Sequence, residues 1–387
     1  MTQQTQTKQI PGGWKKVSIG QIGIYENGRA FKEHDWKKEG LPIIRIQNLT
    51  GTRNKYNYFQ GDVEEKNLVR KGDLLVSWSA TLDVYIWGGP KAVLNQHIFK
   101  VYPKIDKKLL YYLLKEKISE LYAKTHGTGM VHITKGKFEE YEVILPESLH
   151  EQTLIVSAIE KQFTRLNEAV KSLKAVKEKL EIYRKAVLKR AFENGEETLL
   201  GKAFEIIMGQ SPSSEFYNKN GRGLPFFQGK KEFTKRYANI ENWTEKYNKI
   251  ANKGDLLVSI RAPIGPCNIA PEKCAIGRGI AAIRAKNKVE TYFLFNLVTF
   301  YGKELDRMGT WTTFKAISKN TLNSFVVKLP KKEEWRSIVS SIESKFSVID
   351  KIEQVVEASL EKAEKLRKSI LKSAFEGKLV NFEGKSL

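Results

Sequence analysis

Apolar residues recur at intervals of three, four or seven positions through residues 148–195, with lysines between them. This spacing places them on one face of a helix, in a stripe of near-heptad period. Ser148 and Glu151 have the spacing of a capping box, and Asn194-Gly195 suits a C-terminal cap. The pattern predicts one long helix with a break near Gln162. Its stripe consists of Ile155, Ile159, Phe163, Leu166, Val170, Leu173, Leu180, Tyr183 and Val187.

A second stripe of the same period runs over Ile338–Phe375. Both helical stretches end in similar basic and aromatic segments, which begin at Arg184 and Arg367, 183 positions apart. Two helices of matching length, each with an apolar seam too narrow to bury alone, favour an antiparallel pair. A continuous helix over Phe163–Phe192 would be about 45 Å long at 1.5 Å per residue. The second stripe consists of Ile342, Phe346, Ile349, Ile352, Val356, Ala363, Leu366 and Ile370.

The segment before the first helix alternates short apolar runs with turns, which predicts several strands and one helix. In Gly40–Asn48, β-branched residues after a proline predict a buried strand that delivers Arg45, Gln47 and Asn48 to a loop. Lys71–Ala80 begins with a Gly-Asp turn and continues as a buried strand. The other expected elements are strands at Trp14–Ile22, Asn95–Val101 and Tyr141–Leu145, a helix at Lys107–Tyr122 and a loop at 126–133.

The segment after the first helix repeats the one before it. Lys253–Ser259 matches Lys71–Ser77 letter for letter, 182 positions later. Gly223–Gly229, Gly309-Thr310 and Leu329-Pro330 correspond to Gly40–Ile46, Gly127-Thr128 and Leu145-Pro146. An internal repeat decides the architecture of a chain. The sequence predicts an α+β protein with a pseudo-twofold repeat: two similar mixed α/β domains, residues 1–147 and 196–332, held apart by two long antiparallel helices, a coiled coil, in residues 148–195 and 333–387.

The charge of the chain indicates a polyanionic partner. Lysine and arginine exceed aspartate and glutamate by 22, and most of the excess lies in residues 1–147 and 191–332. Clustered cations release counterions from phosphates when they bind, so a polyanion is expected. Two basic domains held apart by the helices could reach neighbouring major-groove windows of double-stranded DNA, which repeats about every 34 Å, so this is the expected partner. A basic surface that serves only solubility is the alternative.

Cysteine usage and hydropathy bound the compartment. Cys267 and Cys274 are too few for a disulfide framework or a four-ligand zinc site and are expected to fill the core. His126 and His132 do not make a convincing metal site. Residues 1–8 lack the apolar core of a secretion signal, and no apolar run reaches the roughly 20 residues needed to cross a bilayer. A cytoplasmic protein without a metal or a membrane partner is expected.

The sequence lacks the enzyme signatures that its charge would make relevant. Gly384-Lys385-Ser386 has no upstream glycine to form a phosphate loop, and the Asn/Asp-Pro-Pro-Tyr/Phe signature of adenine methyltransferases does not occur. The duplicated Lys-Gly-Asp-Leu-Leu-Val-Ser is explained by a turn at Asp73 or Asp255 and a buried strand, so no catalytic residue is assigned. Two alternatives stay open: a nuclease whose active site is not recognised, and a coiled-coil scaffold whose charge is incidental.

Candidate DNA contacts lie in loops that differ between the two copies. Arginine can pair bidentately with guanine, and asparagine or glutamine with adenine. Because the frame repeats while the loops differ, two unlike half-sites are expected. Lys135 and Lys319, at matching places after the Gly-Thr loops, are candidate phosphate contacts. The candidate base contacts are Arg45, Asn48, Arg53, Trp78 and His97 in the first domain and Gln228, Lys230, Lys231, Arg236, Arg261, Arg278 and Trp311 in the second.

The order and duplication of these motifs resemble the DNA specificity subunit of type I restriction-modification systems, often called HsdS. The resemblance covers Trp14 to about Val380. The second copy departs from the family pattern at Glu334-Trp335-Arg336, where the first copy has Glu151-Gln152. The first copy contributes Lys71–Ser77, Asn95–Ile98, Gly127-Thr128 before His132–Gly136, and Leu145-Pro146; the second contributes Gly209–Pro212, Lys253–Ser259, Arg261–Gly265, Ile276–Gly279 and Phe314–Lys319.

This resemblance implies two target recognition domains, separated by two helical regions, that read a split DNA sequence with a fixed unspecified spacer. It also implies a non-catalytic subunit with no cofactor of its own. Family members bind two modification subunits, which carry S-adenosylmethionine and the adenine methyltransferase site, and these complexes can recruit restriction subunits.

Overall fold

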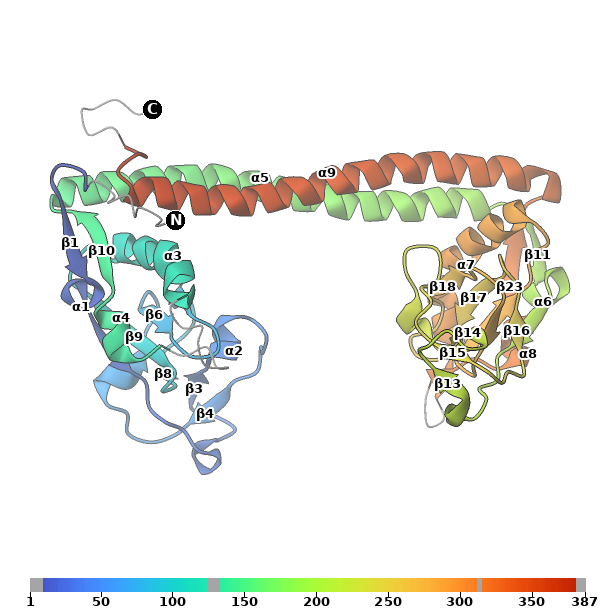
Figure 1. The fold of residues 1–387 in the computed structure, drawn as a ribbon, viewed down its shortest axis with the longest axis horizontal. Helices are drawn as coiled ribbons and strands as arrows, with labels where there is room; N and C mark the ends of the chain where they lie inside the picture. Colours follow the sequence, from blue (N-terminus) through green and yellow to red (C-terminus); the bar gives the residue numbers. More distant parts are fainter. Residues whose placement is uncertain (1–9, 124–132, 312–314, 381–387) are drawn as a thin grey trace, which may run out of the picture. The chain divides into compact units, whose positions relative to one another are not determined.

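The computed structural model describes residues 10–123, 133–311 and 315–380 of the chain. They form two compact units. Unit 1 contains the chain up to Ser172 and from Ser359 onward, and unit 2 contains Leu173–Ala358. Each unit combines one of the two predicted compact segments with parts of both long helices, α5 (Leu149–Phe192) and α9 (Trp335–Phe375) (Figure 1).

Both helices predicted from the apolar stripes are present. The predicted break near Gln162 is wrong, because α5 continues through this residue over its full 44 residues. Glutamine is a good helix former, and Ile159 and Leu166 on either side of it are both buried. α9 begins at Trp335, three residues before the predicted start. No helix in the described ranges is long and apolar enough to span a membrane.

In unit 2 the two helices are joined by ion pairs. Lys177 of α5 lies 3.0 Å from Glu357 of α9. About two turns further along α5, the guanidinium of Arg184 binds the carboxylates of Asp350 and Glu353. The distance to Glu353 is 2.8 Å. Partners thus move toward lower numbers on α9 as numbers rise on α5. The helices are antiparallel within this unit, as the matching stripes predict.

In unit 1 the other parts of the same helices pack through an apolar cluster. Arg367 of α9 lies over the ring of Phe163, 4.8 Å from its centroid, and donates to Oδ1 of Asn167 at 2.6 Å. The stacked guanidinium covers the edge of the apolar seam while its charge stays hydrated. The cluster consists of Leu166, Ala363 and Ile370, with Phe163, Val170 and Leu379 partly buried against it.

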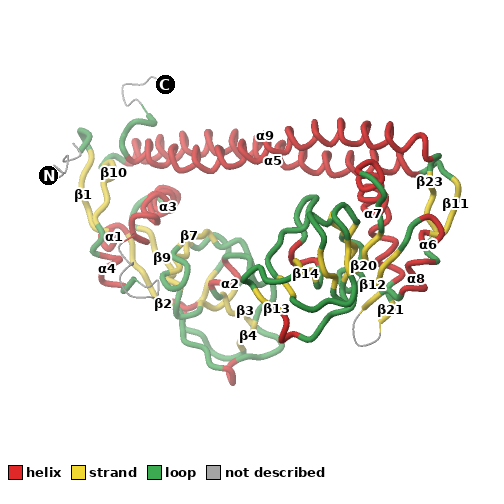
Figure 2. Tube along the Cα trace, turned by 45° about the vertical axis from the view of Figure 1, so that its right-hand side comes forward, coloured by secondary structure: helices red, strands yellow, loops and turns green. Residues whose placement is uncertain are grey.

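Three small sheets and four further α-helices complete the described part of unit 1 (Figure 2). The sheet orders are β1-β10, β2-β9-β6-β7 and β4-β3-β8-β5, and only β3 and β8 run parallel. The strands are β1 (Trp14–Ser18), β2 (Gly23–Asn27), β3 (Leu41–Ile44), β4 (Asn57–Phe59), β5 (Leu68–Val69), β6 (Leu74–Ser77), β7 (Asp83–Ile86), β8 (Ala92–Leu94), β9 (Ile98–Pro103) and β10 (Glu142–Pro146). The helices are the short α1 (Ile19–Ile22) and α2 (Ile46–Leu49), then α3 (Lys107–Ala123) and α4 (Lys135–Glu139).

Unit 2 repeats this plan. Its sheet orders are β11-β23, β12-β20-β17-β18, β13-β15-β14-β19-β16 and β21-β22. The strands are β11 (Glu196–Leu199), β12 (Ile206–Met208), β13 (Tyr217–Asn218), β14 (Leu224–Phe227), β15 (Trp243–Thr244), β16 (Ile250–Ala251), β17 (Leu256–Ser259), β18 (Cys267–Ile269), β19 (Cys274–Ile276), β20 (Ile280–Ile283), β21 (Thr310–Trp311), β22 (Lys315–Ala316) and β23 (Val326–Leu329). The helices are α6 (Leu200–Ala203), α7 (Lys288–Met308) and α8 (Lys319–Asn323).

Two strand predictions in the first segment ran too long. The strand predicted for Gly40–Asn48 ends at Ile44, and the chain turns into α2 because Asn48 Oδ1 accepts from the backbone N–H of Arg45 at 3.0 Å. The strand predicted for Trp14–Ile22 likewise ends at Ser18 and is followed by α1. A polar side chain that caps a turn competes with the sheet ladder.

The two long helices enter their units in the same way despite the change from Gln152 to Trp335. The side-chain N–H of Gln152 donates to the carbonyl of Pro146 at 3.0 Å, and the indole N–H of Trp335 donates to Pro330 at 3.0 Å. Both residues are buried. The departure of the second copy from the family pattern therefore leaves the helix starts equivalent.

Candidate nucleic-acid interface

In each unit two parallel strands end side by side. β3 and β8 are in register at Ile44 and Leu94, and β14 and β19 are in register at Phe227 and Ile276. Parallel strands run out at the same edge of a sheet, so the loops that follow them meet there. Arg45 therefore emerges beside the turn at residues 95–97, and the segment from Gln228 emerges beside the turn at residues 277–279.

In each unit a third loop lies beside these two loops. It follows the duplicated segment, Lys71–Ser77 or Lys253–Ser259, and is held by the serine that ends this segment. Ser77 Oγ donates to the carbonyl of Thr81 at 2.5 Å, and Ser259 Oγ donates to the carbonyl of Pro263 at 3.1 Å. Both serines are buried. We call these segments the strand-end loops: residues 45–53, 78–81 and 95–97 in unit 1, and residues 228–231, 260–263 and 277–279 in unit 2.

The other residues of the duplicated segment form a turn and a buried strand, as predicted. Asp73 Oδ2 accepts from the backbone N–H of Arg70 at 2.9 Å, and Asp255 Oδ2 accepts from that of Asn252 at 2.7 Å. The buried strands β6 and β17 follow. The repeat therefore builds the frame that carries the loops.

The strand-end loops of unit 1 enclose a hollow of about 550 Å³. Two predicted base contacts, Arg45 and His97, line it, and the ring of a third, Trp78, lies 5.4 Å from that of His97. The guanidinium of Arg45 stacks on Trp36 at 4.7 Å. Burial and the neighbouring charge of Arg53 lower the pKa of Arg45. The hollow is lined by Phe31, Arg45, Ile46, Gln47, Thr50, Thr52, Ser79, Ala80, Thr81, Asn95, Gln96 and His97.

The amide of Asn48, another predicted base contact, is used inside the protein. Its Oδ1 accepts from the N–H of Arg45, and its Nδ2 donates to the carbonyls of Arg53 and Lys55 at 3.0 and 3.2 Å. A contact to adenine would have to break these bonds. Arg53 is exposed, and within the described ranges its guanidinium donates only to Oδ1 of Asn57, at 3.2 Å.

Replacing Asn48 by alanine is expected to loosen the loop over residues 45–55. Three hydrogen bonds to backbone groups are lost, at a local cost of about 1–3 kcal/mol. Hydrogen exchange at the amide of Arg45 should accelerate accordingly. Gln47→Ala, which removes an exposed neighbour, serves as the control. Unchanged exchange in Asn48→Ala would contradict this role.

In unit 2 the loops bring together Gln228, Lys230, Lys231 and Arg278. Ser211 Oγ accepts from the backbone N–H of Arg278 at 3.0 Å and lies 3.4 Å from Nε2 of Gln228. Gly279 lets these loops approach, because a Cβ there would collide with the carbonyl of Gln228. The two lysines lie in the short turn after Gln228, and all four side chains are exposed.

The other predicted contacts of unit 2 are placed differently. Arg261 is exposed on the loop after β17, and its backbone pairs with Ala316 of β22. The backbone of Trp311 lies in β21, but its side chain lies outside the described residues. Arg236 forms a two-pronged pair with Glu343 of α9 at 2.8 and 2.9 Å and covers Tyr292. A base contact by Arg236 would have to break this pair.

The two predicted phosphate contacts occupy the same position in their units. Lys135 is the first residue of α4 and Lys319 the first residue of α8, after Thr134 and Ser318. The amide groups at a helix start and a lysine side chain both favour an anion, although α4 and α8 are only five residues long. The loop at Gly127-Thr128 before Lys135, like His126 and His132, lies outside the described residues.

Ten of the twelve residues that line the unit 1 hollow were not among the predicted contacts, and Gln47, Ser79 and Gln96 are three of them. Gln47 follows Arg45 onto α2, while Ser79 and Gln96 lie in the other two strand-end loops. A signal for the last two was available, because Arg261 and Arg278 stand 182 positions later in the repeat.

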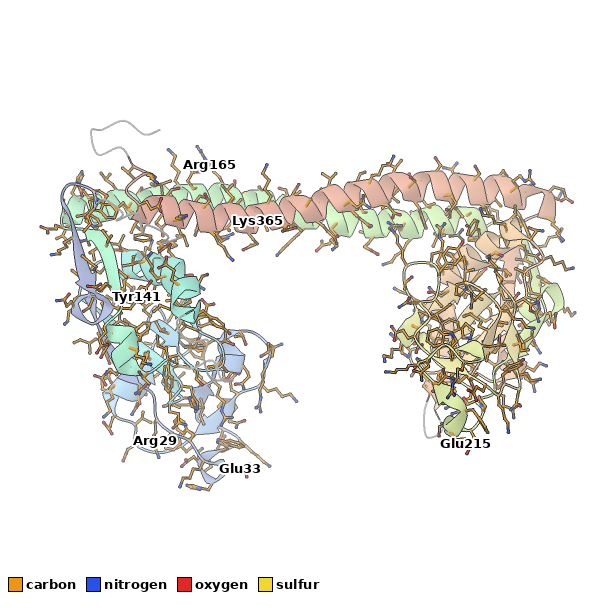
Figure 3. All side chains as sticks on the ribbon, in the orientation of Figure 1. Arg29, Glu33, Tyr141, Arg165, Glu215 and Lys365 are labelled. Atoms are coloured by element: carbon orange, nitrogen blue, oxygen red, sulfur yellow. The ribbon has the colours of Figure 1, made fainter. Side chains whose placement is uncertain are left out.

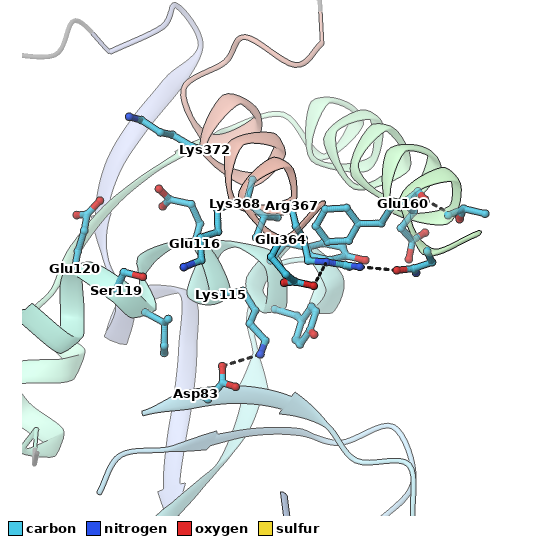
Figure 4. Close-up of a pocket in the computed structure, with 17 residues that line it drawn as sticks. Asp83, Lys115, Glu116, Ser119, Glu120, Glu160, Glu364, Arg367, Lys368 and Lys372 are labelled. Carbon is cyan, nitrogen blue, oxygen red and sulfur yellow. Dashed lines mark hydrogen bonds and ion pairs between the residues drawn. The ribbon is translucent and has the colours of Figure 1, made fainter. Parts of the chain in front are cut away.

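A larger hollow of unit 1, about 1080 Å³, lies between α3 and the long helices (Figure 4). Two of its acidic side chains are paired with lysines: Asp83 lies 2.7 Å from Lys115, and Glu160 lies 2.6 Å from Lys108. Lys365 and Arg165, on the long helices, project from the helix surface (Figure 3). None of the predicted base contacts of unit 1 lines this larger hollow, whereas Arg45 and His97 line the smaller one.

Metal ligation finds no support in the described ranges, where no group of three His, Cys, Asp or Glu side chains could hold an ion. Cys274 is fully buried in a core cluster, and burial raises its pKa to about 12. Cys267 packs partly buried against the main core of unit 2. Both thiols fill apolar space, as predicted.

Comparison with known proteins agrees with this architecture. Residues 11–178 and 193–362 each match the type I restriction modification DNA specificity domain. The putative type I restriction enzyme MjaX specificity subunit of Methanocaldococcus jannaschii is 31% identical, over 97% of this chain and 96% of its own. The EcoBI specificity subunit of Escherichia coli is 25% identical over 96% of this chain and 87% of its own.

One solved structure was reported for the complex assembly and conformational transition of the type I R-M system. It superposes on this chain with a TM-score of 0.79. It is 25% identical and covers 96% of this chain and 100% of that chain. Two copies of the family domain, each matched to one repeat, account for most of the sequence. The chain therefore belongs to the type I restriction-modification DNA specificity subunits, the non-catalytic components of these systems that select the DNA sequence.

Proposed function

We propose that this subunit reads a split, asymmetric DNA sequence with a fixed spacer. Residues 1–147 form one target recognition domain and residues 196–332 the other. The observation that supports this most is the strand-end frame, which occurs twice with unlike side chains. Arg45 at the end of β3 has Gln228 as its counterpart at the end of β14. Equal frames with different donors suit two different half-sites.

Base contacts are proposed for the exposed or half-buried donors of the strand-end loops and for Trp311, and phosphate contacts for Lys135 and Lys319. Asn48 and Arg236 enter this proposal only if DNA displaces their internal partners. The other proposed base contacts are Arg45, Arg53, Trp78, His97, Gln228, Lys230, Lys231, Arg261, Arg278 and Trp311.

As a type I specificity subunit, the chain has DNA and the methyltransferase and restriction subunits as its partners. We propose that two modification subunits, which carry S-adenosylmethionine, dock on it in the cytoplasm. The helical regions, residues 148–195 and 333–387, are proposed to set the spacer.

Methylation mapping of genomic DNA tests the proposal in a host that carries this chain with its modification subunit. Methylated adenines are expected in one split motif with a constant spacer. Replacing residues 1–147 by the corresponding domain of another specificity subunit should change one half of the motif only. A contiguous motif, a change in both halves, or cleavage or methylation of DNA by the purified chain alone would overturn it.

A further inference from the structure

One pair of positions is equivalent in the two units, because matching backbone hydrogen bonds surround it. The first member is the second residue after the central strand, Ser79 after β6 and Arg261 after β17. The second member is the first corner of a tight turn, Gln96 or Arg278. Both members of the pair are separated from their counterparts by 182 positions.

Matching hydrogen bonds fix the equivalence. The turn that holds Gln96 is closed by the N–H of Ile98 donating to Asn95 O at 3.1 Å, and the turn that holds Arg278 by Ile280 donating to Gly277 O at 2.9 Å. Beside each turn, one backbone hydrogen bond connects the turn to the loop that follows the central strand.

That bond runs from Trp78 N–H to His97 O at 3.3 Å in unit 1, and from Ile260 N–H to Gly279 O at 3.0 Å in unit 2. The paired positions thus flank the same interloop bond in both copies.

The backbone on either side of the pair in unit 2 is held rigidly. Arg261 O accepts from Ser259 Oγ at 3.1 Å, and the next residue, Ala262, donates from its N–H to Lys315 O at 3.1 Å. Arg278 is fixed through its N–H to Ser211 Oγ. Both arginine side chains are exposed, and neither has an ion-pair or hydrogen-bond partner within the described ranges. The guanidinium groups of Arg261 and Arg278 are therefore available to a ligand, and hydrogen bonds hold the backbone that carries them.

In unit 1 the pair is neutral. Ser79 and Gln96 line the hollow beside Arg45, and Gln96 Nε2 lies 3.2 Å from His97 Nε2. The backbone N–H of Gln96 donates to Arg29 O at 3.0 Å, so the corner is anchored here too. Arg29 lies in the part of unit 1 away from the long helices (Figure 3).

We propose that these are equivalent specificity-determining pairs: Arg261 and Arg278 contact guanine in the half-site of unit 2, and Gln96, assisted by Ser79, contacts adenine in that of unit 1. The inference rests on the proposed function and names the bases for its two domains. A guanidinium matches the N7 and O6 acceptors of guanine, a glutamine amide matches N6 and N7 of adenine, and serine suits either base. A phosphate contact would favour a cation in both copies, yet unit 1 has serine and glutamine.

The experiment uses the full chain in complex with its modification subunits and a pool of duplexes with randomised sequence. Bound duplexes are sequenced, and the half-site of unit 2 is identified as the half that survives exchange of residues 1–147. Guanines are expected in that half. Arg261→Gln and Arg278→Gln should each relax the preference at one position, whereas the double substitution Ser79→Arg with Gln96→Arg should move the other half toward guanine.

Modified bases test which atoms of the base are contacted. Replacing the assigned guanines by 7-deazaguanine, which lacks the N7 acceptor, should weaken binding of the wild type by about 10- to 100-fold. The arginine variants should lose little further affinity on the modified duplex. Inosine, which keeps N7 and O6, should be tolerated. Lys253→Gln, an exposed charge before β17 at its other end, is the control and should leave the base preference unchanged.

Two kinds of failure are separable. If the wild type selects no split sequence, the proposed function fails and the pair fails with it. If a split sequence is selected but Arg261→Gln and Arg278→Gln weaken all duplexes equally, the arginines contact phosphate and only this inference is overturned. A half-site of unit 2 without guanine, or one insensitive to 7-deazaguanine, overturns it as well.

Discussion

Replacing Phe192 by alanine is expected to destabilise unit 2 by about 3–5 kcal/mol. Phe192 ends α5 with no exposed surface, and its ring packs on Phe293 and Phe300 of α7 with centroids 5.5 and 5.9 Å apart. The cavity would lie where the helix joins the core of the unit. Calorimetry should show the transition of unit 2 lowered by about 6–20 °C, since 1 kcal/mol shifts Tm by about 2–4 °C at this size.

The repeat supplies a matched control for this substitution. Phe375 ends α9 in the core of unit 1, as Phe192 ends α5 in that of unit 2. Phe375→Ala should therefore lower the transition of unit 1, and hydrogen exchange can assign each transition to its unit. Tyr183→Ala, at a half-exposed position of α5, should change little. An undisturbed unit 2 in Phe192→Ala would refute the assigned role.

Inserting four residues into both long helices, after Ser172 and after Ala358, is expected to lengthen the DNA spacer by one to two base pairs. Four residues add about 6 Å of helix, and base pairs are stacked about 3.4 Å apart. These points divide the two units, so the packing inside each is retained. Methylation mapping of the insertion variant measures the new spacer directly, with both half-site sequences unchanged.

An insertion into α5 alone tests whether the helices act together. Because α9 keeps its length, the pairs on one side of the insertion must shift by four residues: either those of unit 1, such as Arg367 with Asn167, or those of unit 2, such as Arg184 with Glu353. The variant should then lose its selection of a split DNA sequence, instead of selecting one with a longer spacer. A spacer of unchanged length in the double insertion would contradict the proposal that the helices set it.

The sequence was a good guide to the elements and a partial guide to the surface. The helical stripes, the buried strands after Gly-Asp and the repeat were all readable, because period and turn chemistry are local properties. The strand predicted through Asn48 failed because one side-chain hydrogen bond ended it. Arg236 was selected for its chemistry, but its carboxylate partner, Glu343, lies 107 positions away on another element.

By itself the sequence determined that the chain is a duplicated α+β protein with two long helices, a basic surface and unlike loops on a shared frame. Only the tertiary structure decided which loop residues meet: the parallel register of β3 with β8 and of β14 with β19 brings three loops together in each unit. It also decided which donors remain available: the side chains of Asn48 and Arg236 bind within the protein, whereas those of Arg261 and Arg278 have no hydrogen-bond or ion-pair partner among the described residues. Spacing along a chain encodes the elements, whereas the pairing of polar groups depends on residues that only folding brings into contact.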